Sequence, residues 1–172
     1  MHACETLGLL KFDFLGLINL TILADAVDLV EKHRGVRLDV DLLPLDDKKT
    51  FDLLSTGETT GIFQLEGSGM RRYVKELKPT EVRDLAAMVA LFRPGPMDLI
   101  PDYNRHKHGQ EVVPAVHPLV DKHTAETYGV MVYQEQVMQI VHELGGIPLR
   151  AAYSLIKAIS KKKEKEISKQ RP

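Results

Sequence analysis

Apolar residues recur every three or four positions along most of the chain, which is the spacing of one face of a helix. The first such segment covers residues 21–33 and ends at Gly35, a residue suited to a helix end. Further helices are predicted over 47–54, 68–77, 80–92, 98–108, 134–144 and 149–159. Pro94-Gly95-Pro96 ends the helix over 80–92 and predicts a rigid corner. The pattern indicates a chain dominated by helices.

A different pattern stands near the N-terminus, where polar and apolar residues alternate. On a strand, Lys11 and Asp13 would lie on one side, and Leu10, Phe12 and Phe14 would face a core. This alternation predicts a β-strand over 11–16. An aspartate in such a strand can hold a divalent metal, although the spacing alone favours an ordinary strand with a solvent-facing lysine and aspartate. The short apolar run over 61–65 is a second candidate for a strand or an extended segment. The expected fold class is α+β, predominantly helical.

Composition narrows the class of protein. The chain has 172 residues, of which 44% are hydrophobic and 27% charged, as in one modest globular domain or part of a larger one. Cys4 is the only cysteine, which excludes an internal disulfide, and with no secretory leader we expect a reducing cytoplasm. The apolar stretch over 15–30 is interrupted by Asn19, Asp25 and Asp28, so it predicts a buried amphipathic helix and no membrane span.

The charge is unevenly distributed, although its total is only −1. Residues 160–172 carry six lysines and arginines against two glutamates. A run of this kind is typical of a solvated helix end, and it can also meet phosphates.

Three further segments carry candidate chemistry. The segment 66–72 places glycines and a helix start beside Arg71 and Arg72, which fits a phosphate site and a plain capped turn equally well. His106-Lys107-His108 invites a metal site, but the intervening lysine and the lack of a second ligand pair favour a solvated loop. The segment 133–136 opens a helix with polar groups that could face a base or a sugar, and it also fits an ordinary polar first turn.

Five motifs in order resemble the bacterial DNA polymerase III alpha subunits, the C-family replicative polymerases. They are Lys11-Phe12-Asp13-Phe14-Leu15-Gly16-Leu17, Gly61-Ile62-Phe63-Gln64-Leu65-Glu66, Ala90-Leu91-Phe92-Arg93-Pro94-Gly95-Pro96, Tyr128-Gly129 and Tyr133-Gln134-Glu135-Gln136-Val137-Met138. The match spans nearly the whole chain and is closer to the widespread alpha-subunit branch than to the proofreading-fused branch. The resemblance implies that residues 1–60 end a palm domain and that 61–172 form part of a fingers domain.

The resemblance also implies an activity: template-directed addition of deoxynucleotides to a primer 3′ end, with two Mg²⁺ ions organising the reacting oxygens. Asp13 matches one of three metal-binding palm carboxylates and is the candidate catalytic and metal-binding residue. The other two belong to an Asp-x-Asp motif upstream of the matched region, so we expect residues 1–172 alone to be inactive. The implied partners are primer–template DNA, deoxynucleoside triphosphates, the sliding clamp and the clamp loader, with no membrane.

The resemblance supplies candidate binding residues as well. Lys11, Lys157, Arg93, Tyr133 and Gln134 are the candidates for nucleotide binding. Arg71, Arg72, Lys161, Lys162 and Lys163 are the candidates for DNA binding. The family carries two adjacent arginines where this chain has Ile156 and Lys157. Lys157 keeps a positive charge without the paired geometry of a guanidinium, and Ile156 keeps neither.

These departures leave a second function open, namely a noncatalytic helical module that binds nucleic acid or protein and keeps the polymerase scaffold. The missing arginine pair and the near-neutral charge favour it slightly. An Asp-x-Asp strand encoded upstream in the natural gene would support the polymerase instead.

Overall fold

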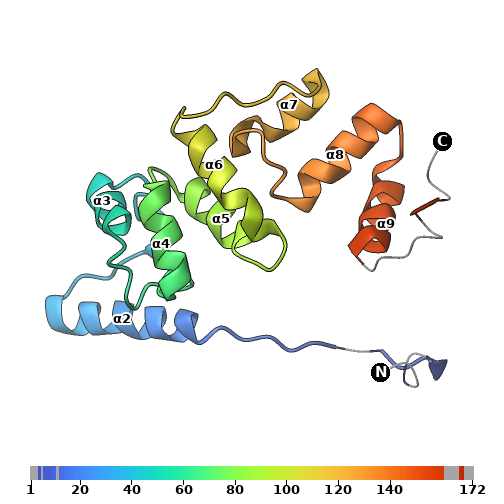
Figure 1. Ribbon diagram of the computed structural model, residues 1–172. Coiled ribbons are helices and arrows are strands. Elements are labelled where there is room, and N and C mark those ends of the chain that lie inside the picture. The colour runs from blue at the N-terminus through green and yellow to red at the C-terminus, as the bar shows by residue number, and fades with distance from the viewer. Residues whose placement is uncertain (1–3, 5, 11, 161–166, 169–172) are drawn as a thin grey trace. The chain divides into compact units, whose positions relative to one another are not determined.

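The computed structural model describes residues 4, 6–10, 12–160 and 167–168 (Figure 1). The chain forms two compact units, Met1–Pro44 and Leu45–Pro172. Helices dominate both units, which confirms the mainly helical pattern of the sequence. None of the helices within the described ranges is long and apolar enough to cross a membrane.

The first unit is built on one long helix, α2, which covers Ile18–Arg34 and contains the predicted segment 21–33. Gly35 ends it in the left-handed conformation, with φ of +66°, and its N–H donates a hydrogen bond to the Glu31 carbonyl. Three basic residues occupy the last turn, where they complement the partial negative charge of a helix C-terminus. A short 3₁₀ helix, η1, follows over Val40–Leu42.

The strand predicted over 11–16 is not seen. Residues 12–16 are irregular and exposed, Lys11 lies outside the described residues, and no strand occurs among those that the structure describes. A strand requires hydrogen bonds to a neighbouring strand, and alternation of side chains along the chain does not supply that neighbour. The α+β expectation is therefore corrected to a helical fold for the described residues.

The core of the second unit lies among its first helices (Figure 1). These are α3 over Lys48–Thr56, α4 over Ser68–Leu77, α5 over Val82–Leu91, η2 over Pro96–Leu99 and α6 over Ile100–Lys107. Their buried apolar side chains include Leu54, Met70, Val74, Leu77, Met88, Leu91, Ile100 and Tyr103. Helices α4 and α5 bury apolar residues at the predicted spacing, which confirms the pattern there. No residue of α2 is buried, so the expectation of a buried helix over 15–30 is not met in this structure.

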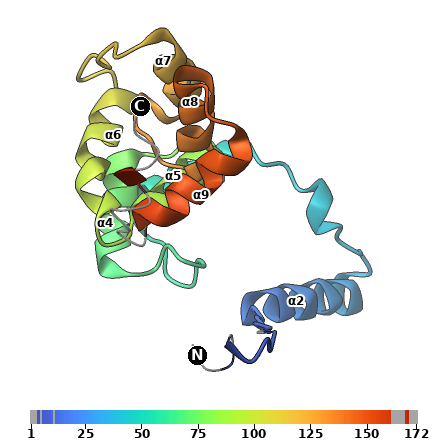
Figure 2. The same ribbon diagram turned by 90° about the vertical axis from the view of Figure 1, so that its right-hand side faces the viewer.

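The remaining helices are α7 over Pro118–Thr124, η3 over Ala125–Thr127, α8 over Gln134–Gly145 and α9 over Leu149–Ser160. Helix α8 packs against both α7 and α9 (Figure 2). The sequence analysis missed α7, which is short and carries little apolar periodicity. Its start is marked by Pro118 at the first position and by His117, whose Nδ1 accepts a hydrogen bond from the Leu119 N–H.

The apolar run over 61–65 forms successive turns, so its interpretation as a strand or extended segment is wrong. The Ile62 N–H donates to the Thr59 carbonyl, and the Leu65 N–H donates to the Ile62 carbonyl. The buried Thr59 hydroxyl donates to the Leu65 carbonyl, at 2.5 Å. Short apolar runs do not distinguish a strand from a folded loop, and these local hydrogen bonds decide the outcome.

Candidate nucleotide- and nucleic-acid-binding residues

Asp13 belongs to the first unit and lies in the exposed, irregular segment before α2. Within the described ranges, no group of three histidine, cysteine, aspartate or glutamate side chains is placed to hold a metal ion. A single carboxylate does not form a two-metal site, because each cation needs several oxygen ligands. The described residues therefore do not by themselves fit a magnesium centre, and Asp13 is at most one ligand of one.

Lys157 is exposed on α9, at one of the two positions where the resemblance predicts adjacent arginines. Its Nζ lies 4.3 Å from the centroid of the Tyr153 ring, one helical turn away, which is cation–π distance. Ile156 is half-buried, as expected for an apolar side chain at the edge of the α8–α9 packing. The exposed ammonium is the feature on which the interpretation of Lys157 as a nucleotide-binding residue depends.

The sequence analysis did not identify Tyr153 as a neighbour of Lys157. The spacing of the two residues could have indicated it, because residues four apart on a helix share a face. Lys161, Lys162 and Lys163, the DNA-binding candidates that follow α9, lie outside the described residues.

Arg93 is exposed in the break between α5 and η2. Its N–H donates to the Leu91 carbonyl and its carbonyl accepts the Met97 N–H, so both backbone groups are used in the corner. Gly95 in the same corner has φ of +104°, a conformation that favours glycine. The predicted corner is confirmed, and it presents the Arg93 side chain to solvent.

The start of α8 is organised by Gln136, whose side chain is buried. Its Oε1 accepts hydrogen bonds from the N–H groups of Val132 and Tyr133, at 2.8 and 2.9 Å. Its Nε2 donates to the His123 carbonyl and to the Thr127 hydroxyl, at 3.0 and 2.8 Å. The buried glutamine therefore joins the start of α8 to the segment around α7, a role that the sequence analysis did not assign.

The two candidates beside Gln136 differ in exposure. Tyr133 caps α8 and is half-buried, and burial raises its pKa above the usual value, with a smaller contribution from the charge of Glu126. Gln134 is exposed and donates a hydrogen bond to the Glu135 carboxylate. Of the pair, Gln134 presents the more accessible polar group.

Arg71 and Arg72 point to different surroundings. Arg71 is half-buried; its Nε donates to the Glu66 carbonyl and its Nη2 to the Thr60 hydroxyl, both at 2.8 Å. Arg72 is exposed, with its guanidinium 4.7 Å from the Tyr73 ring centroid and its Nε 3.8 Å from Oε1 of Glu76. Arg71 thus closes the loop before α4, and Arg72 is the more exposed of the two.

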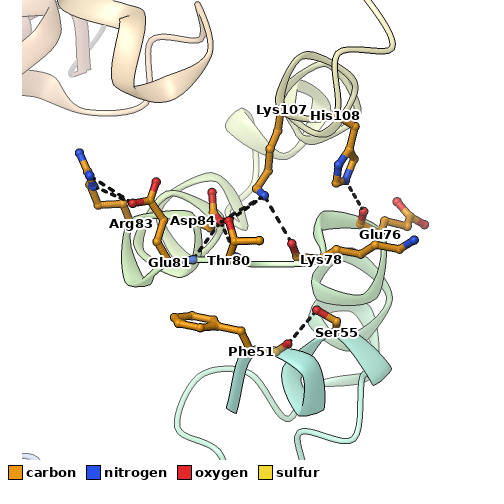
Figure 3. A network of polar contacts seen from close by, with 10 residues as sticks. All are labelled: Phe51, Ser55, Glu76, Lys78, Thr80, Glu81, Arg83, Asp84, Lys107 and His108. Carbon is orange, nitrogen blue, oxygen red and sulfur yellow. Dashed lines mark hydrogen bonds and ion pairs between the residues drawn. The ribbon is translucent and has the colours of Figure 1, made fainter. Parts of the chain in front are cut away.

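The expectation of a solvated loop is wrong for His106 and Lys107, which end α6, whereas His108 lies in the exposed turn that follows. Figure 3 shows Lys107 and His108. Lys107 ends α6 and its side chain is buried, with Nζ 3.3 Å from Oδ2 of Asp84. Asp84 Oδ2 also accepts the Thr80 N–H at 2.8 Å. The histidine rings make hydrogen-bonding contacts to backbone carbonyls: Nδ1 of His106 lies 2.9 Å from the Tyr128 carbonyl oxygen, and Nε2 of His108 lies 3.0 Å from that of Glu76.

The comparison with known proteins identifies the family. Residues 19–172 match the model of the bacterial DNA polymerase III alpha subunit finger domain. The chain is 52% identical over 176 residues to the DNA polymerase III subunit alpha of Thermus aquaticus, a match that covers 99% of this chain and 14% of that protein. It is 46% identical over 171 residues to the subunit of Bacillus subtilis, covering 99% of this chain and 15% of that protein.

The mainly helical fold and the match to the finger-domain model show that the chain is part of a bacterial DNA polymerase scaffold. The chain belongs to the DNA polymerase III alpha subunit family. It spans about one seventh of the length of the relatives it matches.

Proposed function

We propose that residues 1–172 act within a complete replicative polymerase that adds deoxynucleotides to a primer 3′ end. The match of residues 19–172 to the finger-domain model carries this proposal. Within the parent protein, residues 1–60 would end the palm and residues 61–172 would form part of the fingers. The substrates would be primer–template DNA and deoxynucleoside triphosphates, and the sliding clamp and clamp loader would be protein partners in the cytoplasm.

The fingers would contribute positive charge and polar groups to the nucleotide. Lys157 supports this role through its exposed ammonium on α9, and Arg93 and Gln134 through their exposed side chains. Lys157 would neutralise a phosphate as a point charge, because an ammonium lacks the forked geometry of a guanidinium. Tyr133 would line the site through its half-buried ring at the start of α8. Lys11 would meet the triphosphate from the palm side.

Asp13 would provide one carboxylate ligand to Mg²⁺ in the complete subunit, together with carboxylates outside residues 1–172. Magnesium bound there would stabilise the attacking and leaving oxygens of an in-line phosphoryl displacement. For DNA, the exposed Arg72 and the Lys161–Lys163 segment are the proposed backbone contacts. Arg71 is the weaker candidate, because its guanidinium already binds within the loop.

Primer extension tests the proposal. A complete alpha subunit carrying residues 1–172 should incorporate deoxynucleotides, and Asp13→Asn should nearly abolish incorporation while primer–template affinity is retained. Asp25→Asn is the matched control, since Asp25 is an exposed acid on α2. Equal incorporation by Asp13→Asn and Asp25→Asn would remove Asp13 from the catalytic role. Purified residues 1–172 alone should not extend a primer, and Mg²⁺-dependent extension by them would contradict the proposed division of carboxylates.

A noncatalytic binding module remains the second candidate. The half-buried Ile156 favours it, because that position cannot contact a phosphate as an arginine would. The two candidates separate in the same assay: the module predicts DNA or protein binding by the complete natural chain without any incorporation.

A further inference from the structure

Helix α9 has one exposed face that carries positive charge and an aromatic ring. Arg150, Tyr153 and Lys157 follow one another at spacings of three and four residues, so they share a side of the helix, the basic face. All three are exposed, whereas Ala152 and Ala158 are buried. The packing of α9 against α8 therefore leaves the basic face accessible.

The charges of α9 favour an anion at this face. The helix Leu149–Ser160 contains no aspartate or glutamate, and its charged residues are Arg150 and Lys157. A surface with charges of one sign attracts ligands of the opposite sign. The side chains of α9 therefore fit a phosphate group better than a cationic or neutral ligand.

The Tyr153 ring contacts the Lys157 ammonium. Their distance is 4.3 Å from Nζ to the ring centroid, and the tyrosine side chain is 41% exposed. A lysine side chain has many rotamers, and fixing it in one of them costs conformational entropy. A cation–π contact favours the rotamers that place the ammonium over the ring. The contact therefore lowers the entropy that an anion must offset when it orders the lysine.

A lysine at position 157 gains more from such a contact than an arginine would. The guanidinium of arginine is a planar fork that meets two phosphate oxygens at once, whereas an ammonium is a point charge on a flexible stem. The resemblance predicts adjacent arginines at positions 156 and 157, where this chain has a half-buried isoleucine and an exposed lysine. A neighbouring ring can supply part of the orientation that the ammonium lacks.

We propose that Tyr153 is a positioning residue for nucleotide binding, whose ring holds the Lys157 ammonium in place for the triphosphate of an incoming deoxynucleotide. Tyr153 acts through Lys157 in this role. The inference rests on the proposed function, which assigns Lys157 to the triphosphate. It extends that function to position 153, for which the resemblance supplies no role.

The same contact also fits two simpler roles. A pair of side chains four residues apart stabilises a helix by itself. A lysine in the last turn, as Lys157 is, complements the partial negative charge of the helix C-terminus. Both of these roles change the stability of the folded protein, whereas a positioning role changes the KM for the nucleotide.

Steady-state incorporation by the complete subunit tests the proposal. Tyr153→Leu should raise the KM for deoxynucleoside triphosphates about twofold to fivefold with little change in kcat, as expected for the loss of one exposed cation–π contact. Tyr153→Phe keeps a ring that attracts a cation and should keep the original KM. In a Lys157→Gln background, Tyr153→Leu should raise the KM no further, because the ring then has no ammonium to hold.

Melting temperature and primer–template affinity are measured on the same variants. The positioning role predicts that Tyr153→Leu is folded at the assay temperature and binds primer–template DNA as tightly as the unsubstituted subunit. Tyr153→Gln, which also lacks a ring, serves as a second variant if Tyr153→Leu fails to fold. The KM effect should shrink at high salt, because it acts through the charge of Lys157.

Each contrary outcome overturns the proposal. An unchanged KM in Tyr153→Leu would reduce the contact to helix stabilisation, and a lower KM would show that the ring holds the ammonium away from the triphosphate. An equal rise in Tyr153→Leu and Tyr153→Phe would assign the effect to the hydroxyl. Additive effects of Tyr153→Leu and Lys157→Gln would mean that the ring acts independently of the lysine. Weaker primer–template binding with an unchanged KM would assign the pair to the DNA backbone.

The failure of this inference is distinguishable from that of the proposed function. If the unsubstituted subunit incorporates deoxynucleotides and Lys157→Gln raises the KM while Tyr153→Leu does not, only the role of Tyr153 is rejected. An unsubstituted complete subunit that incorporates no deoxynucleotide would reject the proposed function, and this inference with it.

Discussion

Lys107 and Asp84 form a buried ion pair that joins the end of α6 to the start of α5. Their Nζ and Oδ2 atoms lie 3.3 Å apart, and the two side chains are only 7% and 1% exposed (Figure 3). The Lys107 ammonium also donates to the Lys78 carbonyl and the Thr80 hydroxyl, both at 3.4 Å. The turn between α4 and α5 is thereby held against α6.

Lys107→Met should destabilise the protein by about 3 kcal/mol, because removing one partner leaves the other charge buried without compensation. Chemical unfolding in urea measures the change. The matched control is Lys48→Met, since Lys48 pairs with Asp52 on the surface of α3, at 2.6 Å. That substitution should cost no more than about 0.5 kcal/mol. The role of the pair is rejected if both variants unfold at the same urea concentration.

Gln136→Ala should cost about 2 kcal/mol, since it removes both the acceptor and the donor groups that join α8 to the segment around α7. Gln134→Ala is the control, because Gln134 is exposed on the first turn of the same helix. Its free energy of unfolding should change by less than about 0.5 kcal/mol. A similar loss in both variants would mean that the helix start as a whole, and not the buried glutamine, carries the stability.

Gly129→Ala should be strongly destabilising. Gly129 has φ of +81°, and a Cβ atom there would lie 2.3 Å from Cγ1 of Val113. Gly109→Ala separates the two effects, because Gly109 has φ of +62° with no atom within 4 Å of the added carbon. The control should cost about 1 kcal/mol for the left-handed backbone, and Gly129→Ala at least about 1 kcal/mol more for the clash. Thermal unfolding of the two variants tests the difference, and equal melting temperatures would show that the loop carrying Val113 moves aside.

Acid should weaken the contact between α7 and α8. Hydrogen bonds from Lys122, and then from His123, hold the pKa of Glu143 below its usual value. A carboxyl whose pKa is lower in the folded state stabilises that state above its unfolded pKa of about 4.5, and the contribution is lost as the pH falls through the folded pKa. We expect Glu143→Gln to lower the melting temperature at pH 6 and to have a smaller effect at pH 3. A melting-temperature difference that is constant over this range would contradict the assignment.

Lys157→Gln in a complete subunit should raise the KM for deoxynucleoside triphosphates about threefold to tenfold, because one exposed charge on α9 is lost. Lys157→Arg should keep most of the affinity. Lys49→Gln serves as the control, since Lys49 is an exposed lysine on α3. Steady-state incorporation assays at two salt concentrations measure the effect, which should shrink at high salt. An unchanged KM in Lys157→Gln would remove α9 from triphosphate binding.

The sequence was informative wherever structure depends on local spacing. Apolar periodicity placed α4 and α8 almost to their ends, and the helix predicted over 47–54 covers most of α3. Longer motifs identified the family, because several of them occur in one order. The sequence was uninformative where one residue's environment depends on a distant segment, as for the turns over 61–65 and the short helix α7.

For the candidate binding residues too, the sequence supplied the candidates and the structure distinguished between them. The resemblance to the family supplied Asp13, Arg93, Tyr133, Gln134 and Lys157 as candidates. Only the tertiary structure separates Arg71, which is bound within its own loop, from the more exposed Arg72, because that difference rests on hydrogen bonds to Glu66 and Thr60. No spacing rule distinguishes two adjacent arginines on this basis.

The sequence by itself determined a helical chain of the DNA polymerase III alpha family, because helix periodicity and ordered motifs are properties of neighbouring residues. The tertiary structure alone decided that Lys107 and Gln136 are buried and that the alternating segment 12–16 forms no strand. Lysine and glutamine enter a protein interior only when partners elsewhere in the chain satisfy them, and a strand needs a neighbour. Those partners are set by packing between segments distant in sequence.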